Sequence, residues 1–340
     1  MRGLPAHAGV PTAPVSHPLL RISDLTVEFP STRGRARAVD HVSLDVSRGE
    51  VLGVVGESGC GKSMTALAVL GLVPAPGRIA GGRVLFDGQD LLTIPPIALQ
   101  QIRGKRIGMI FQEPMTALNP VLTVGEQIAE SIRHHLKFSR ADAKTRTIEL
   151  LRLVGIPSAE SRWDEYPHQL SGGMRQRVMI AMAIACDPDV IFADEPTTAL
   201  DVTVQAQILT LLRDLRERLG MAMVFISHNL GVIAQVAHRV VVMYAGRIVE
   251  QTTAAQLFAQ PQHPYTKGLL ASLPPADFHI GRAGRLSAIP GVVPVLGSIP
   301  GGCTFAPRCP VVVERCVQEP PLLSTGNDHL TRCWLVEPPP

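Results

Sequence analysis

The chain has 340 residues, of which 46% are hydrophobic and 18% charged, and its formal net charge is +3. This composition excludes a disordered chain, because enough apolar side chains are present to build a core. Nucleic acid is not expected as a partner, since the charge is nearly balanced and only 4% of the residues are aromatic. No apolar run reaches the ~18 residues that cross a bilayer, and prolines interrupt the N-terminus where a signal peptide would be apolar. We therefore expect a cytoplasmic chain that reaches a membrane only through partners.

Residues 1–17 are rich in Pro, Ala and Gly and are predicted to form a disordered tail. From Leu19 to about Gln260, short apolar runs alternate with helical patterns, and this alternation favours an α/β fold. Several of the runs are continuous in Val, Ile and Leu, as buried parallel strands require. The expected strands are Leu20–Phe29, Ala38–Val46, Val51–Val55, Val84–Phe86, Ile107–Gln112, Val190–Ala193, Met223–Ser227 and Val240–Met243.

The stretch from Thr123 to Tyr166 has a helical pattern only, and Thr123 with Glu126 has the spacing of a capping box. It predicts a helical insertion in the α/β core. The composition changes near Ala271, because the last 70 residues hold 12 of the 29 prolines and four of the six cysteines. We expect a domain over residues 18–270, followed over residues 271–340 by a small, loop-rich extension that a metal ion stabilises.

One segment fits the phosphate-loop pattern G-x-x-x-x-G-K-[ST]: Gly56, Glu57, Ser58, Gly59, Cys60, Gly61, Lys62 and Ser63. It follows the strand-like run Val51–Val55 and precedes a helical pattern that opens at Met64, which is the context this motif requires. Its glycines let backbone N–H groups turn toward phosphate oxygens, and a helix N-terminus favours an anion. Lys62 is expected to reach the β- and γ-phosphates, and the Ser63 hydroxyl to bind Mg²⁺. Cys60 occupies a variable position and is expected to be a bystander that alkylating reagents can reach.

Two acids follow the apolar run Val190–Ala193. Asp194, at the end of the strand, is expected to hold Mg²⁺, and Glu195 to polarise a water molecule for attack on the γ-phosphate. Upstream, Ser171, Gly172 and Gly173 precede a helical run through Cys186 and form a second candidate anion site.

These motifs, with Gln112, Asp201 and His228, resemble ATP-binding cassette (ABC) ATPases in their order and spacing over roughly residues 19–260. The resemblance implies an α/β fold with an antiparallel β part and a helical subdomain over about 113–170. It implies that Gln112 and His228 sense the γ-phosphate, Gln112 also contacting Mg²⁺, and that Glu195 drives hydrolysis. The resemblance also implies the ATP-binding residues. Phe29 would stack on adenine, and ATP would further contact Gly56, Glu57, Ser58, Gly59, Cys60, Gly61, Lys62, Ser63 and Met64. Four residues would act across a dimer interface: Ser171, Gly172, Gly173 and Asp201. Residues Arg33–Arg37 are expected in a loop. The sequence departs from the family in reading LSGGM instead of LSGGQ, and in having Asn229 after His228 where Asp is common.

Four segments narrow the resemblance to the ATPases of oligopeptide and dipeptide importers: Phe111–Pro120, Gln262–Leu270, Ile289–Gly291 and Gly302–Pro310. That group also contains nickel and glutathione importers. The resemblance implies a peripheral protein on the cytoplasmic face of the bacterial inner membrane, bound to two integral membrane permease subunits. A second related ATPase subunit or a copy of this chain would complete the dimer, and an extracytoplasmic binding protein would deliver the substrate. The alternative is a soluble ABC ATPase of DNA repair or translation, which would favour a coiled-coil insertion or two cassettes in one chain.

The clustered cysteines have the spacing C-x5-C-x6-C-x16-C, which lacks the C-x2-C pairs of most zinc sites and of bacterial ferredoxins. Spacing alone indicates a metal of unknown identity. The resemblance favours a 4Fe-4S cluster, with structural zinc and four free thiols as alternatives. The ligands would be Cys303, Cys309, Cys316 and Cys333.

Overall fold

The computed structural model describes residues 17–32, 34–198, 200–273, 288–299, 301–326 and 328–336. The disordered tail predicted over residues 1–17 lies outside these ranges, apart from His17. Within them, no helix combines the length and the apolar character needed to cross a membrane.

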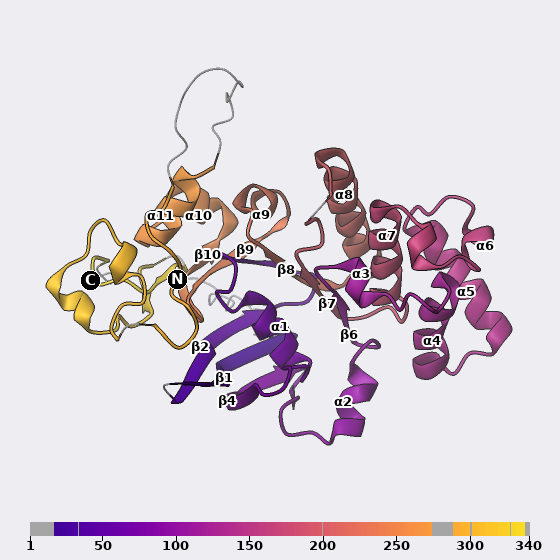
Figure 1. Cartoon of the computed structure of the whole chain (residues 1–340), viewed down its shortest axis with the longest axis horizontal. Coiled ribbons are helices and arrows are strands. Elements are labelled where there is room, and N and C mark those ends of the chain that lie inside the picture. The colour runs from indigo at the N-terminus through magenta and orange to yellow at the C-terminus, as the bar shows by residue number, and fades with distance from the viewer. Residues whose placement is uncertain are drawn as a thin grey trace, which may run out of the picture.

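The strands form two sheets (Figure 1). A four-stranded antiparallel sheet has the order β2-β1-β4-β5, and an eight-stranded sheet has the order β11-β12-β10-β9-β3-β8-β7-β6. In the larger sheet the strands from β9 to β6 run parallel, and β10 and β12 join its edge antiparallel. The strands are β1 Leu20–Ser31, β2 Gly34–Val46, β3 Val51–Val55, β4 Arg78–Phe86, β5 Gln89–Asp90, β6 Ile107–Ile110, β7 Val190–Asp194, β8 Ala222–Ser227, β9 Arg239–Tyr244, β10 Arg247–Thr253, β11 Leu323–Ser324 and β12 Leu330–Thr331.

Between β6 and β7 the chain is helical, and Figure 1 shows these helices gathered at one end of the molecule. The C-terminal segment, by which we mean the described residues between 288 and 336, lies at the other end. The Thr123 side chain accepts a hydrogen bond from the Glu126 N–H at 3.3 Å, so Thr123 is the N-cap of α4. The helices are α1 Lys62–Val69, α2 Pro96–Ile102, α3 Pro114–Ala117, α4 Val124–Leu136, α5 Arg140–Leu153, α6 Ala159–Arg162, α7 Gly172–Ala183, α8 Val202–Leu219, α9 Leu230–Val236, α10 Ala254–Ala259 and α11 Pro264–Ala271, with short 3₁₀ turns at Pro167–Gln169, Ala306–Arg308 and Glu314–Val317.

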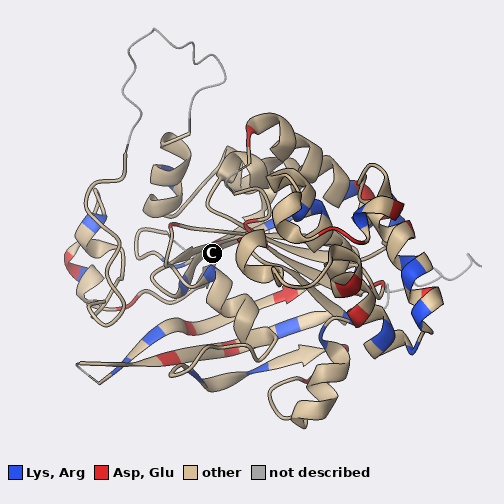
Figure 2. Cartoon of the chain, turned by 45° about the vertical axis from the view of Figure 1, so that its right-hand side comes forward, with Lys and Arg blue, Asp and Glu red and all other residues tan. Residues whose placement is uncertain are grey.

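The larger sheet separates two hydrophobic cores. In β7, Val190 and Phe192 pack toward the antiparallel sheet, whereas Ile191 and Ala193 pack toward the helices. Both faces of the central strands are therefore covered, and this is why those strands read as continuous apolar runs. Figure 2 shows basic and acidic residues interspersed over both layers.

Several expectations about strands differ from the structure. β6 ends at Ile110 rather than at Gln112, and β4 begins at Arg78, earlier than Val84. The strands β5, β10, β11 and β12 were not expected at all. The residues 34–37 belong to β2 instead of a loop, with Arg37 directly opposite Glu28 of β1 and within 3.6 Å of its carboxylate. Opposite charges on neighbouring strands stabilise the pairing of those strands, so exposed arginines are compatible with β2.

Candidate functional site

The segment from Gly56 to Met64 joins the central strand β3 to α1. Gly56, Gly59 and Gly61 have φ values of 155°, 78° and 102°, which side chains rarely tolerate. A Cβ at Gly61 would also lie 2.5 Å from the Ala38 carbonyl oxygen, so backbone packing requires glycine there. The loop therefore places the N-terminus of α1 at the carboxyl edge of the parallel strands, where anions bind in such folds.

Lys62 and Ser63 connect this loop to its surroundings. Lys62 is 5% exposed, and its ammonium donates to the carbonyl oxygens of Gly56 at 2.7 Å and Glu57 at 3.0 Å. The Ser63 hydroxyl donates to the Asp194 carboxylate at 2.9 Å, across to the end of β7. A hydroxyl and a carboxylate oxygen are ligands that Mg²⁺ accepts, so these two residues fit the expected cation.

A second group of side chains surrounds the carboxylate of Glu195. It accepts hydrogen bonds from the Thr198 hydroxyl at 2.8 Å and the Gln112 amide at 3.3 Å, and the His228 Nδ1 lies 3.1 Å away. Glu195 has φ 48°, a strained conformation for a residue other than glycine. Three segments far apart in the sequence thus meet on one carboxylate.

The two neighbouring acids differ in protonation behaviour. Burial opposes ionisation of Glu195, but hydrogen bonds from Thr198 and His228 outweigh it and lower its pKa. Burial raises the pKa of Asp194, and the hydrogen bond from Ser63 offsets this only in part. Glu195 is therefore the ionised acceptor at neutral pH, and a cation bound at Asp194 would favour the charged form of that carboxyl.

Ser171, Gly172, Gly173 and Asp201 lie together at the N-termini of two helices. Ser171 caps α7 by accepting from the Met174 N–H at 3.3 Å, and Asp201 caps α8 by accepting from the Val204 N–H at 2.9 Å. A Cβ at Gly173 would lie 3.0 Å from the Val204 side chain, so the two helix ends are in contact. Figure 1 shows α7 among the helices at one end of the molecule, away from α1.

The remaining expected ATP-binding residues have varied surroundings. Phe29 is half-buried, and a Cβ at Gly77 would lie 2.5 Å from its ring. Ser58 and Gly59 are exposed, whereas Met64 packs partly buried against the core below the antiparallel sheet. Cys60 is 1% exposed, and burial raises the pKa of its thiol. The expectation that alkylating reagents reach Cys60 is wrong for this conformation, because both the access and the thiolate are lacking.

The four C-terminal cysteines lie near one another but not around a common point. The Cys303 N–H donates to the Cys316 carbonyl oxygen at 2.9 Å. Burial raises the pKa of the thiols of Cys303, Cys309 and Cys333, and neighbouring thiols raise each of them further. Yet within the described ranges no three or more His, Cys, Asp or Glu side chains are arranged to hold a metal ion. The expected iron–sulfur or zinc site is therefore not supported by this arrangement.

Sequence reasoning missed three residues at the site. Thr198 follows Glu195 within the same turn, and its nearness in sequence was an available signal. Tyr265 and Arg308 contact Glu57 of the loop from 208 and 251 residues away. Arg308 stands inside the Gly302–Pro310 segment, but nothing in the sequence connects it to Glu57.

Comparison with known proteins explains this arrangement. Residues 39–198 match the family model of the ABC transporter, and residues 249–316 match that of the oligopeptide/dipeptide transporter C-terminal region. The chain is 50% identical over 315 residues to the dipeptide transport ATP-binding protein DppD of Haemophilus influenzae, covering 93% of this chain and 94% of that protein. The chain belongs to the ATP-binding proteins of ABC transporters.

This ABC ATPase is also 48% identical over 322 residues to the oligopeptide transport ATP-binding protein OppD of Bacillus subtilis, covering 94% of this chain and 89% of that protein. Its fold resembles the dimeric ATP-binding cassette MJ0796 bound to ADP and Pi, with a TM-score of 0.62 and 28% identity over 69% of this chain and 98% of that one. The expected ABC-type α/β fold with an antiparallel β part is confirmed, and the enzyme hydrolyses ATP.

Proposed function

We propose that this ABC ATPase powers the import of oligopeptides or dipeptides. The observation that carries the proposal is the match of residues 249–316 to the oligopeptide/dipeptide transporter C-terminal region, in the same chain as a cassette. The relatives named above are ATP-binding proteins of dipeptide and oligopeptide transport. The test is uptake of labelled di- to pentapeptides by membrane vesicles containing the assembled transporter, with and without ATP.

Within the cassette, Lys62 is proposed to bind the β- and γ-phosphates, and Ser63, Asp194 and Gln112 to hold Mg²⁺. Glu195 is the base that polarises the attacking water, because it is the ionised carboxylate on which Thr198 and His228 converge. The loop glycines and the N-terminus of α1 supply N–H groups for phosphate oxygens. Phe29 would contact adenine with its half-buried ring.

The signature segment Ser171–Gly173 and Asp201 are proposed to act on ATP bound by a second subunit. Both lie at helix N-termini that touch each other. Helix N-termini attract phosphate, but one chain cannot bring two such surfaces onto the same nucleotide when they lie in separate layers. A head-to-tail dimer, with a related ATPase or with a copy of this chain, brings each surface onto the nucleotide of the other subunit.

The transporter is proposed to contain two permease subunits in the inner membrane, with this chain bound at their cytoplasmic face and an extracytoplasmic protein delivering peptide. The helical segment of about 113–170 would transmit dimer closure to the permeases, within a domain of 18–270. Purification of the chain with membranes, and its release when the permease genes are deleted, tests this assembly. A soluble ABC ATPase would stay in the soluble fraction in both strains.

We further propose that Cys303, Cys309, Cys316 and Cys333 bind an iron–sulfur cluster after local rearrangement of their side chains. Four thiols lie in one small segment, near enough that neighbouring thiols raise the pKa values of Cys303, Cys309 and Cys333, and once deprotonated they are the donors that such a cluster takes. Metal analysis of anaerobically purified protein should give about four iron per chain. A content of one zinc per chain would instead indicate a zinc site, and protein without metal would indicate four free thiols.

A further inference from the structure

The C-terminal segment reaches the phosphate loop through Arg308. Its guanidinium donates to both carboxylate oxygens of Glu57, at 2.7 and 3.1 Å. Such a two-pronged pair fixes orientation as well as distance. The Arg308 side chain is 4% exposed, and that of Glu57 is 30% exposed, so the pair is largely shielded from water. The contact is therefore stronger and more rigid than a surface ion pair.

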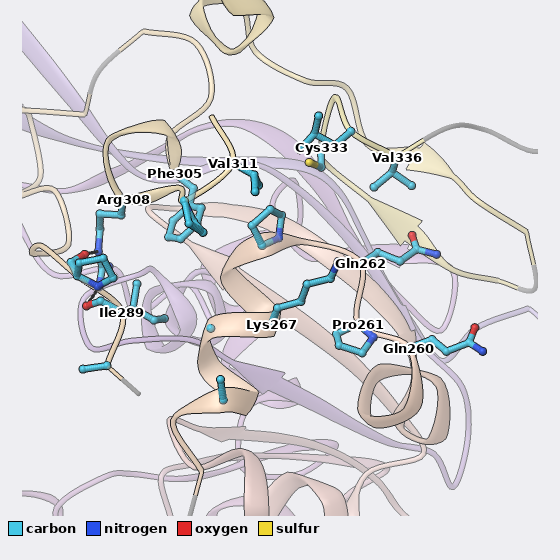
Figure 3. A pocket seen from close by; sticks show the side chains of 17 residues that line it. Gln260, Pro261, Gln262, Lys267, Ile289, Phe305, Arg308, Val311, Cys333 and Val336 are labelled. Atoms are coloured by element: carbon cyan, nitrogen blue, oxygen red, sulfur yellow. Dashed lines mark hydrogen bonds between the residues drawn. The ribbon is translucent and has the colours of Figure 1, made fainter. Parts of the chain in front are cut away.

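Arg308 is itself held in place by its surroundings. Its Nε donates to the Pro290 carbonyl oxygen at 2.9 Å, and its guanidinium lies 5.8 Å from the centre of the Tyr244 ring. Figure 3 shows Arg308 beside Ile289 and Phe305, on the wall of a cavity of about 930 Å³ between α11 and the C-terminal segment. Several partners besides Glu57 thus hold the guanidinium in place.

A second contact holds the same loop residue by its backbone. The Glu57 N–H donates to the Tyr265 hydroxyl at 2.9 Å. Tyr265, on α11, is fully buried, and its ring packs against Tyr244 at 4.7 Å and Phe305 at 5.4 Å between ring centres. Phe305 belongs to the C-terminal segment, so this aromatic cluster joins that segment to the cassette beside the loop.

Glu57 also contacts the functional lysine. Its carbonyl oxygen accepts from the Lys62 ammonium at 3.0 Å. One residue therefore has its side chain on Arg308, its N–H on Tyr265 and its carbonyl oxygen on Lys62. A displacement of Glu57 moves both the loop backbone and the carbonyl oxygen that orients Lys62.

We propose that Arg308 is a positioning residue for ATP binding: acting through Glu57, it holds the phosphate loop in its binding conformation, so that the C-terminal segment sets the affinity of the cassette for ATP. The inference rests on the proposed role of residues 56–64 as the ATP phosphate site. A loop that is already ordered before ATP binds gives a higher affinity for ATP, because no binding energy is lost in ordering it.

The test is a double-mutant cycle on the full chain, with Glu57→Gln, Arg308→Gln and the double variant, measuring the ATP dissociation constant by calorimetry. Each single variant should weaken ATP binding about tenfold, equivalent to about 1.4 kcal/mol. The double variant should also be about tenfold weaker rather than about a hundredfold, because both changes remove the same contact. Saturating ATP should restore most of the turnover, since the effect lies in KM and not in kcat.

Glu319→Gln is the matched control. Glu319 pairs with Arg332 at 3.1 Å and with Arg247 of β10, so it attaches the same segment to the cassette away from the loop. The Glu319→Gln variant should bind ATP with the same affinity as the parent chain. Additive losses in the cycle, unchanged affinity in both single variants, or an equal loss in Glu319→Gln would each overturn the proposal.

Two variants, Glu57→Gln from the cycle and Lys62→Ala, show which part of the proposal fails if the expected coupling is not found. Glu57→Gln leaves every partner of Arg308 within the C-terminal segment intact, so it reports on the contact even if Arg308→Gln does not fold. Lys62→Ala tests the phosphate site separately. If Lys62→Ala binds ATP normally, the phosphate-site proposal fails; if Lys62→Ala loses ATP and the cycle shows no coupling, only the role of Arg308 fails.

Discussion

Acidification should weaken the folded state through His263. This histidine is 2% exposed at the N-terminus of α11, where its Nδ1 accepts a hydrogen bond from the Tyr265 N–H at 3.1 Å. Burial lowers the pKa of His263 to about 4. The Glu250 carboxylate and a hydrogen bond with the Arg332 backbone act in the opposite direction, whereas the charges of Arg332 and Lys267 add to the lowering. Protonation would convert the acceptor Nδ1 into a donor facing the Tyr265 N–H, so the charged form does not suit this site.

The size and sign of the effect follow from proton linkage. The unfolded chain takes up a proton near pH 6.5 and the folded chain only near pH 4, so the unfolded state binds more protons between these values. Stability from this group is therefore complete above pH 6.5 and falls as the pH decreases toward 4. Each pH unit in that window costs up to about 1.4 kcal/mol, which gives about 2 kcal/mol between pH 7 and pH 5.

Urea unfolding of the purified chain at pH 7, 6 and 5 measures this slope. His263→Asn retains a capping acceptor that does not titrate, and should flatten the curve by about 2 kcal/mol over that range. His168→Asn, which changes an exposed histidine, should leave the slope as in the parent chain. The reasoning is refuted if the His263→Asn slope equals that of the parent, whatever its absolute stability.

Three further predictions concern the ATP site. Glu195→Gln should bind ATP but turn over at least about a hundredfold more slowly in the assembled transporter, because the amide cannot polarise water; turnover within threefold of the parent contradicts its role. Lys62→Ala should lower ATP affinity by one to two orders of magnitude, about 1.5–3 kcal/mol for a charge-assisted contact, and an unchanged dissociation constant by calorimetry would exclude the phosphate-loop assignment. Ser171→Arg should block ATP-driven dimerisation in size-exclusion chromatography but leave ATP binding to the single chain intact, whereas loss of both would put the two motifs in one site.

The elements that could be predicted from the sequence are those in which consecutive residues are apolar and buried. The run Val190–Ala193 is apolar on both faces because helices cover one side of the sheet and the antiparallel strands the other. β10 escaped prediction because Glu250, Gln251 and Thr252 are polar yet buried. Glu250 is stabilised there by N–H groups of Gln262 and His263 and by His329, which no local pattern reveals.

The same contrast applies to the site. The loop from Gly56 to Ser63 is a local motif, since its glycine conformations and its following helix depend on neighbouring residues. The roles of Gln112 and His228 at the γ-phosphate came only from the family resemblance, and their convergence on the Glu195 carboxylate is seen only in the structure. The contact of Arg308 with Glu57 depends on how two segments pack in space, and neither spacing nor composition encodes that distance.

ATP-dependent peptide uptake tests the central claim most directly. The chain, with a related ATPase or with a second copy of itself, would be reconstituted with the two proposed permeases in liposomes, with the proposed binding protein on one side and ATP on the other. The account predicts uptake of a labelled dipeptide or oligopeptide that needs ATP and disappears with Glu195→Gln in this chain. ATP hydrolysis that no peptide stimulates, together with uptake of nickel or glutathione but of no peptide, would contradict it.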